Sequence, residues 1–188
     1  HSMAACAKHF LGYGFSEGGR DYNPTDISGY TIHNCVLPAF RAAVDAGCAT
    51  VMGSFNDVNG QPVASSHYYL TELLRDEMGF EGFVVSDWGS IRQMVREGVA
   101  RDLKDCAAKA LPAGMDMDMD RTCYAAHLES LVNEGVVKEE DIDNAVRRVL
   151  RVKFACGLFD HPFSTRRPID KAAHRKLARE IAGESMLL

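Results

Sequence analysis

Short apolar stretches alternate with helical patterns along this chain, and this alternation restricts the folds that it can adopt. The apolar stretches cover residues 3–10, 49–55, 82–87 and 115–119. Strands that alternate with helices are typical of βα units built around a parallel sheet. The third stretch is apolar without interruption, which indicates a strand buried on both faces. We therefore predict parallel strands.

The helical patterns have matching start and stop signals. They fall over residues 37–46, 67–78, 102–112, 124–134, 140–156 and 171–188. Pro38 suits the first turn of the first helix, and Gly47 and Gly79 stand where two helices should end. Residues 159–168 contain two prolines and predict an extended linker before the last helix.

Four βα units make half of a (β/α)8 barrel, which typically needs about 250 residues. The predicted fold class is therefore α/β, with half of a TIM barrel followed by a C-terminal linker helix. The polar residues agree with this, because they gather at the C-terminal ends of the predicted strands: Lys8 and His9, Asn56 and Asp57, Asp87, and Asp116. That edge is where barrels and open α/β sheets hold their active sites.

Composition excludes several other classes. The 188 residues include 21 Lys and Arg against 26 Asp and Glu, without a dense basic cluster, so nucleic acid is not an expected partner. No apolar run is long enough for a membrane span, so no membrane partner is expected. The six cysteines form no C-x-x-C pair, which argues against a zinc knuckle or a thioredoxin motif. Residues 1–3 resemble an expression scar, which leaves the compartment unknown.

Asp87 is the sharpest catalytic candidate. A carboxylate at a strand end beside Trp88 suits a nucleophile that attacks the anomeric carbon of a sugar held on an aromatic platform. The alternative is a helix cap, in which Asp87 or Ser90 merely starts the next helix.

Lys8 and His9 offer two adjacent donors for sugar hydroxyls or for a carboxylate. Their alternative is a salt bridge and a satisfied histidine at the rim.

Two further segments have open interpretations. The glycine-rich, aromatic loop over residues 12–23 could cover a binding site or be a flexible surface loop, and it lacks the phosphate-binding glycine patterns. Asp116, Asp118 and Asp120 could bind Mg²⁺ or Ca²⁺ if the strand continues, but later acids in this run would more simply cap the next helix. We predict no metal site and no cofactor.

Several motifs together closely resemble glycoside hydrolase family 3. They are Lys8-His9-Phe10, residues 18–23, residues 51–60, residues 79–89 with Val84-Val85-Ser86-Asp87-Trp88, residues 113–117, residues 142–150 and residues 157–160. The resemblance therefore covers nearly the whole chain. It implies a retaining exo-β-glycosidase of the β-glucosidase and β-xylosidase branch, acting on terminal non-reducing β-D-glucosyl residues of a β-glucoside or related oligosaccharide.

The resemblance also implies roles for individual residues. Asp87 matches the nucleophile that forms the covalent glycosyl-enzyme, and Lys8 and His9 match the pair that hydrogen-bonds the sugar. The remaining substrate-binding matches are Met52 and Phe55, which wall the subsite, Trp88 at the entrance, and Arg20 in a loop near the pocket. Phe55 replaces a tyrosine of some relatives and would lose a hydroxyl contact.

Part of the family's machinery has no match here. The loop at residues 17–22 lacks the Asp-x-His dyad of the N-acetylglucosamine branch, and the glucosidase branch takes its acid/base glutamate from a second domain. The Asp and Arg of the first barrel strands are also without a match. We therefore expect an inactive fragment: an expression scar at 1–3, a half-barrel domain at 4–158, and a linker and helix at 159–188 leading to a missing domain.

Two alternatives remain open at this point. The chain could be a non-catalytic half-barrel assembly module, or a complete small α/β protein that binds Mg²⁺ at Asp116 and Asp118. A half-barrel exposes strand edges and an apolar sheet face, so we expect a homodimer that covers them or relaxation into a flavodoxin-like open sheet.

Overall fold

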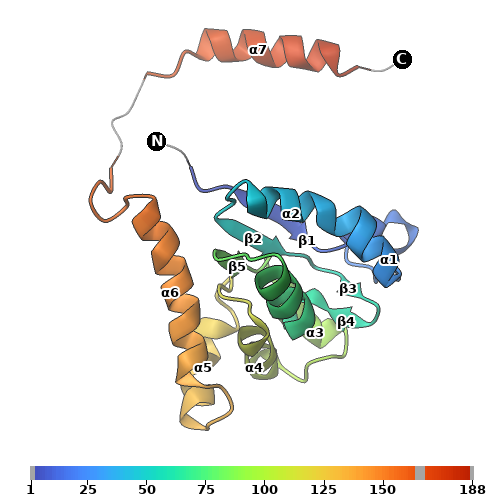
Figure 1. Cartoon of the computed structure of the whole chain (residues 1–188), viewed down its shortest axis with the longest axis vertical. Coiled ribbons are helices and arrows are strands. Elements are labelled where there is room, and N and C mark those ends of the chain that lie inside the picture. Colours follow the sequence, from blue (N-terminus) through green and yellow to red (C-terminus); the bar gives the residue numbers. More distant parts are fainter. Residues whose placement is uncertain (1–2, 164–167, 187–188) are drawn as a thin grey trace.

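A three-stranded parallel sheet forms the centre of the molecule (Figure 1). The computed structural model describes residues 3–163 and 168–186. The strands are β1 (Cys6–Phe10), β2 (Thr50–Gly53) and β5 (Phe83–Val85), in the order β1-β2-β5. Ala7 pairs with Val51, and Val51 pairs with Val84. The first three predicted strands and their parallel direction are confirmed, each strand being shorter than its apolar stretch.

The fourth predicted strand, residues 115–119, is reduced to one parallel bridge between Val85 and Met117. The backbone amide of Val84 donates to the carboxylate of Asp116 at 2.7 Å, where a strand would offer a backbone carbonyl. The Ser86 amide still donates to the Met117 carbonyl at 2.9 Å. The prediction of a full strand was therefore wrong, because the Asp116 side chain accepts a hydrogen bond that a backbone carbonyl would accept in a regular sheet.

The six predicted helices are found to within a few residues of the predicted bounds. They are α2 (Leu37–Asp45), the π-helix η5 (Tyr68–Glu77), α4 (Leu103–Ala113), α5 (Tyr124–Asn133), α6 (Glu139–Ala155) and α7 (Lys171–Glu184). Two further helices, α1 (Gly29–Thr31) and α3 (Ser90–Arg96), were not predicted. A π-helical turn, η3 (Ile32–Val36), joins α1 to α2. Short 3-10 turns are η1 (Tyr13–Phe15), η2 (Glu17–Gly19) and η4 (Val63–Ser65). Pro38 lies in the first turn of α2, and both Gly47 and Gly79 have a positive φ.

A small antiparallel hairpin, β3 (Asp57–Val58) and β4 (Gln61–Pro62), follows β2 and was not predicted. Its turn residues, Asn59 and Gly60, both have a positive φ. Asn-Gly is the strongest short hairpin signal in a sequence, so the residues themselves carried the information.

The core lies between the sheet and the helices. Leu70, Leu73 and Leu74 of η5 are buried on one helix face, and they join Val51 and Val84 of the sheet in a single cluster. Burying a leucine side chain contributes about 1.5–3 kcal/mol. The spacing of these residues therefore both forms the helix and fixes it on the sheet.

One buried carboxylate ties three elements together. Asp116 accepts from Arg75 of η5 at 2.5 Å and from Arg148 of α6 at 2.8 Å, besides the amide of Val84 in β5. Its side chain is almost wholly buried, so the two guanidinium groups compensate its charge. This node holds β5, and hence the residue that follows it, in place.

The C-terminal helix α7 lies apart from the rest of the chain (Figure 1). All its residues are exposed. The predicted linker at 159–168 is described only at its two ends, and residues 164–167 lie outside the described residues, as do residues 187–188 of the predicted last helix. Residues 1–2 of the predicted expression scar also lie outside them. Across residues 3–163 and 168–186, no helix has the length and apolar character to span a membrane.

Candidate active site

Asp87 stands directly after β5, at the carboxyl end of the sheet. Its Oδ1 accepts the backbone amide of Trp88 at 2.6 Å, and its carbonyl accepts the amide of Ser90 at 3.1 Å. The N-cap of α3 is Gly89, whose φ is 76°, and no side chain caps that helix. The alternative interpretation of Asp87 or Ser90 as the helix cap is therefore wrong, and the Asp87 carboxylate is free to face the site.

His9 approaches the same carboxylate from β1. Its Nε2 lies 3.2 Å from Oδ2 of Asp87, and the two side chains are 25% and 18% exposed. Burial lowers the pKa of His9 below its ordinary value of 6.5, and the nearby Lys8 ammonium lowers it further, against the raising effects of Asp87 and Asp21. A neutral imidazole at Asp87 orients the carboxylate without neutralising it.

A series of aromatic contacts leads from His9 to the loop at residues 12–23. The ring of Tyr13 lies 5.3 Å from the His9 ring and 6.3 Å from that of Phe55, and the rings of Tyr22 and Phe55 meet edge to face at 4.9 Å. Burial raises the pKa of Tyr13 to about 12, with help from the charge of Asp21. The phenol is therefore neutral and can exchange hydrogen bonds with a bound hydroxyl.

The other predicted site residues differ in their placement. Met52 is half-buried on β2 opposite Val85, whereas Lys8 is exposed beside His9. Trp88 is 62% exposed at the rim. Arg20 is exposed in its loop, and no ion pair or hydrogen bond within the described residues joins it to Asp87 or His9. The structure thus gathers His9, Asp87 and their aromatic neighbours and leaves Arg20 outside this cluster.

Three further residues of this cluster, Tyr13, Asp21 and Tyr22, were not predicted as site residues. All three belong to the glycine-rich loop at residues 12–23, which was considered as a binding loop. Buried Asn56 holds this loop to the sheet, because its Nδ2 donates to the Leu11 carbonyl at 3.4 Å and to Thr25 Oγ1 at 2.9 Å. The aromatic content of the loop was the available signal.

A hollow of about 840 Å³ opens beside Trp88. Tyr22, Phe55 and Trp88 form its aromatic side, and Arg92, Gln93, Arg96 and Glu97 of helix α3 and its end form its polar side. Its size lies within the range of ordinary ligand sites. Trp88 and Gly89, the two residues after Asp87, line this hollow, whereas Asp87 and His9 do not.

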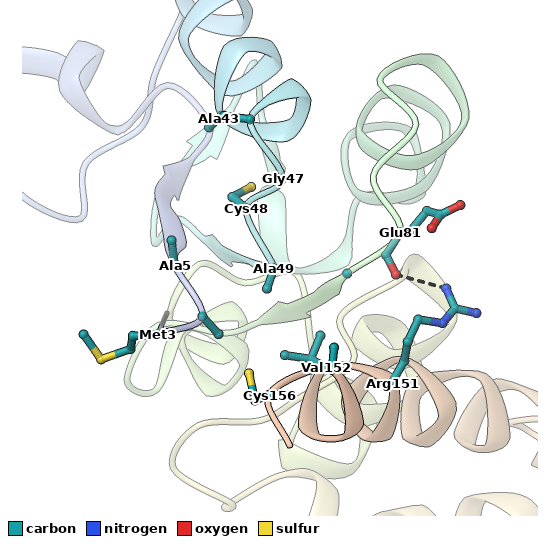
Figure 2. Close-up of a pocket in the computed structure, with 14 residues that line it drawn as sticks. Met3, Ala5, Ala43, Gly47, Cys48, Ala49, Glu81, Arg151, Val152 and Cys156 are labelled. Atoms are coloured by element: carbon teal, nitrogen blue, oxygen red, sulfur yellow. Dashed lines mark hydrogen bonds between the residues drawn. The ribbon is translucent and has the colours of Figure 1, made fainter. Parts of the chain in front are cut away.

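A second hollow, of about 700 Å³, lies at the opposite end of the strands. Figure 2 shows Ala5, Ala49 and Glu81 around it, close to where β1, β2 and β5 begin, with Val152 and Cys156 of the α6 region facing them. Active sites of α/β sheets lie at the carboxyl ends of the strands. This position argues against a catalytic role for the second hollow.

The acidic residues after Gly114 form structural contacts within the chain. Asp116 is occupied by two arginines, and Oδ2 of Asp118 accepts the amides of Cys123 and Tyr124 at 2.9 and 3.0 Å at the start of α5. Within the described residues, no group of three His, Cys, Asp or Glu side chains could hold a metal ion. The alternative of a Mg²⁺ site at Asp116 and Asp118 therefore has no support in this geometry.

Comparison with known sequences agrees with this arrangement. A family model described as the glycosyl hydrolase family 3 N terminal domain matches residues 1–152. The chain is similar to a periplasmic beta-glucosidase of Salmonella typhimurium, with 41% identity over 100% of this chain and 26% of that protein. It is also similar to a putative beta-xylosidase of Formosa agariphila, with 37% identity over 98% of this chain and 25% of that protein. The chain thus spans about a quarter of the length of these relatives.

Solved structures agree as well. A beta-glucosidase from Listeria innocua in complex with glucose superposes with a TM-score of 0.83 at 41% identity, covering 85% of this chain and 22% of that one. The same enzyme in complex with isofagomine gives a TM-score of 0.85 at 39% identity, covering 90% of this chain and 24% of that one. With the family match over most of its length, the chain belongs to glycosyl hydrolase family 3.

Proposed function

We propose that this chain carries the nucleophile of a retaining exo-β-glycosidase that hydrolyses terminal non-reducing β-D-glucosyl residues. The observation that supports this most is the position of Asp87: it ends a parallel strand, it is held by the Trp88 amide at 2.6 Å, and His9 lies 3.2 Å away. A carboxylate with fixed orientation at the rim of a pocket suits attack on an anomeric carbon.

In the proposed first step, an oxygen of Asp87 attacks the anomeric carbon. The bond from that carbon to the leaving oxygen breaks, and the leaving oxygen takes a proton from an acid. Water then attacks the same carbon, gives up a proton to the conjugate base, and releases the sugar and Asp87. His9 keeps the attacking carboxylate oriented during both displacements.

The sugar would lie between the aromatic residues and the Lys8–His9 pair. Lys8 donates to its hydroxyls, and Nδ1 of His9 accepts from one while Nε2–H donates to Asp87. Met52 and Phe55 wall the subsite, and Trp88 stands at the entrance. We assign Arg20 to the same pocket only through a movement of its loop, since its side chain is exposed. The Listeria innocua enzyme in complex with glucose supports a glucosyl substrate.

We also propose that the acid lies outside this chain. The chain would comprise an expression scar (1–3), a half-barrel (4–158), and a linker and helix (159–188) leading to a second domain that supplies an acid/base glutamate. General acid catalysis contributes roughly 10²–10⁴-fold to such reactions. By itself the chain is therefore expected not to turn over ordinary β-glucosides.

The proposal is tested with an aryl β-glucoside whose leaving group is stable without protonation. Such a substrate does not need the missing acid for the first step, so we expect release of the aryl alcohol from the wild-type chain and none above background from Asp87→Ala. Asp160→Ala, a matched loss of an exposed carboxylate, should behave as wild type. Equal release by wild type and Asp87→Ala would refute the role of Asp87.

The alternative is a non-catalytic half-barrel module that serves folding or assembly. This function predicts cooperative unfolding but no stabilisation by β-glucosides or by isofagomine. A shift of the melting temperature with isofagomine that is lost in Asp87→Ala would favour the glycosidase. Absence of both the shift and aryl release would favour the module.

We propose further that two copies pair through the open half-barrel edges. On α6, Val146, Leu150 and Phe154 follow each other at one-turn spacing and are all exposed. The outer edge of β1 is also unpaired in the described sheet. Sedimentation should show a concentration-dependent dimer that Leu150→Asp weakens, and a monomer at every concentration would refute this pairing.

A further inference from the structure

The turn after Asp87 is covered by one side chain, that of Arg92. A Cβ atom on residue 89 would lie 2.5 Å from Nε and 2.9 Å from Nη2 of Arg92, so the guanidinium lies directly over the backbone of Gly89. Gly89 also has a φ of 76°, which other residues rarely adopt. A glycine at 89 therefore suits both the φ of this turn and the space that the Arg92 side chain occupies.

Asp120 fixes Arg92 in this position. Its Oδ2 lies 2.9 Å from Arg92 Nε, and the side chains are 4% exposed for Asp120 and 49% for Arg92. The contact is an ion pair without hydrogen-bond alignment, since Oδ2 has no hydrogen-bond partner. The hydroxyl of Thr122 donates to the other oxygen, Oδ1, at 2.8 Å. A buried carboxylate thus anchors a half-exposed guanidinium.

The segment that carries Asp120 is itself joined to the strand of the nucleophile. The amide of Met119 donates to Ser86 Oγ at 3.0 Å, and the amide of Ser86 donates to the Met117 carbonyl at 2.9 Å. Ser86 is completely buried. Residues on both sides of Asp87 therefore connect to the same acidic segment, one through Ser86 and one through Arg92.

The pKa values of Asp118 and Asp120 shift in opposite directions. Burial raises the pKa of Asp118, against the amides of Tyr124 and Cys123 that donate to its carboxylate. Burial also acts to raise the pKa of Asp120, but the hydrogen bonds from Thr122 and the charge of Arg92 outweigh it, and the pKa of Asp120 is lowered. Asp120 is thus the ionised partner of Arg92.

We propose that Arg92, anchored by Asp120, is a positioning residue that fixes the Asp87–Trp88–Gly89 turn and so sets the place of Trp88 at the entrance. Arg92 acts through the backbone of Gly89 and touches no reacting atom. Trp88 needs such support because its ring is largely exposed and packs little against the core. An effect of Arg92 on catalysis rests on the proposed function, whereas its effect on the position of Trp88 does not.

Trp88 provides a direct readout, because it is the only tryptophan of the chain. We would measure its fluorescence anisotropy and its quenching by acrylamide in the full 188-residue chain. Arg92→Ala and Asp120→Asn should each lower the anisotropy and raise the quenching constant. The double variant should change little more than either single one, because both remove the same contact.

Arg96→Ala is the matched control, since Arg96 lies one turn later on α3, lines the same hollow, and forms no ion pair within the described residues. It should leave the fluorescence of Trp88 unchanged. The urea midpoint separates this effect from loss of fold: Asp120→Asn should alter the Trp88 signal at an unchanged midpoint, and Arg92→Lys should restore only part of the anisotropy. Wild-type fluorescence in both Arg92→Ala and Asp120→Asn, or an equal change in Arg96→Ala, would overturn the proposal.

Release of the aryl alcohol distinguishes failure of the proposed function from failure of the positioning role of Arg92. If the wild-type chain releases the aryl alcohol, Arg92→Ala should slow that release by up to about 10²-fold, as expected for a misplaced reacting group. If the wild type releases none, the proposed function fails while the Trp88 signal still decides the role of Arg92. If the wild-type chain and Arg92→Ala both release the aryl alcohol and have the same Trp88 fluorescence, the positioning role of Arg92 is refuted and the proposed function is not.

Discussion

At the scale of single residues, the contact between His9 and Asp87 is central to the proposed mechanism. Because burial and Lys8 lower the pKa of His9, we predict a titration midpoint below 6.5 for its imidazole. Asp87 opposes that shift, so Asp87→Asn should lower the midpoint further. NMR titration of the histidine ring measures both. A midpoint above 6.5, or no change in Asp87→Asn, would contradict the proposed pairing.

The same shift has a consequence for stability. Below pH 6.5 the unfolded chain takes up a proton at His9 that the folded chain resists, so stability should fall as the pH decreases from 6.5 toward the folded pKa. His9→Gln should remove this part of the pH dependence in urea unfolding. His127→Gln, on α5, serves as the control and should keep the dependence.

Residue by residue, the sequence predicted the site only in part. Asp87 could be predicted because it directly follows an apolar strand, and His9 because it ends another. Arg92 and Asp120 could not, because their pairing depends on how α3 lies beside the acidic segment after β5, and no local pattern in the sequence encodes that. In the sequence, an arginine that positions a site residue cannot be told from an arginine that forms an ordinary surface ion pair.

At the scale of elements, stability depends most on Asp116, which joins η5, α6 and β5. Asp116→Asn leaves Arg75, which is mostly buried, without its charged partner, and removing one member of a buried pair typically costs about 3–5 kcal/mol. We predict a loss of this size in the free energy of unfolding. Asp143→Asn breaks only an exposed pair with Arg147 on α6 and should cost about 0.3–0.5 kcal/mol. Similar losses for both variants would contradict the role of the node.

Elements with a strong internal pattern were predictable, and those set by tertiary contacts were not. The apolar faces of η5 and α4 repeat at helical spacing, so both helices appeared in the sequence nearly at their observed bounds. Residues 115–119 looked like a strand because apolar and acidic residues alternate there. Asp116 and Asp118 instead take backbone amides as partners, which ends the ladder after Met117.

At the scale of the whole molecule, the chain is an α/β half-barrel with a parallel sheet. The succession of its three strands and the six predicted helices followed from alternation alone, but the association of its open faces did not, because exposed edges do not identify what covers them. If the proposed acid/base lies outside the chain, water must attack the glycosyl-enzyme without help from a base. Azide needs no base, so it should attack the anomeric carbon, displace the Asp87 carboxylate and raise the steady-state rate with the activated substrate, giving a β-glucosyl azide. In Asp87→Ala, azide can only displace the leaving group directly, so any product should be the inverted α-glucosyl azide.

The most direct test of the central claim is to identify the glycosylated residue. After brief reaction with the activated aryl β-glucoside and acid quenching, peptide mass spectrometry should find one glucosyl residue on Asp87, and none in Asp87→Asn. An unactivated alkyl β-glucoside should give no adduct, because the acid proposed to protonate its leaving group lies outside this chain. A glucosyl residue on another side chain, or no adduct from the activated substrate, would contradict the assignment of Asp87 as the nucleophile.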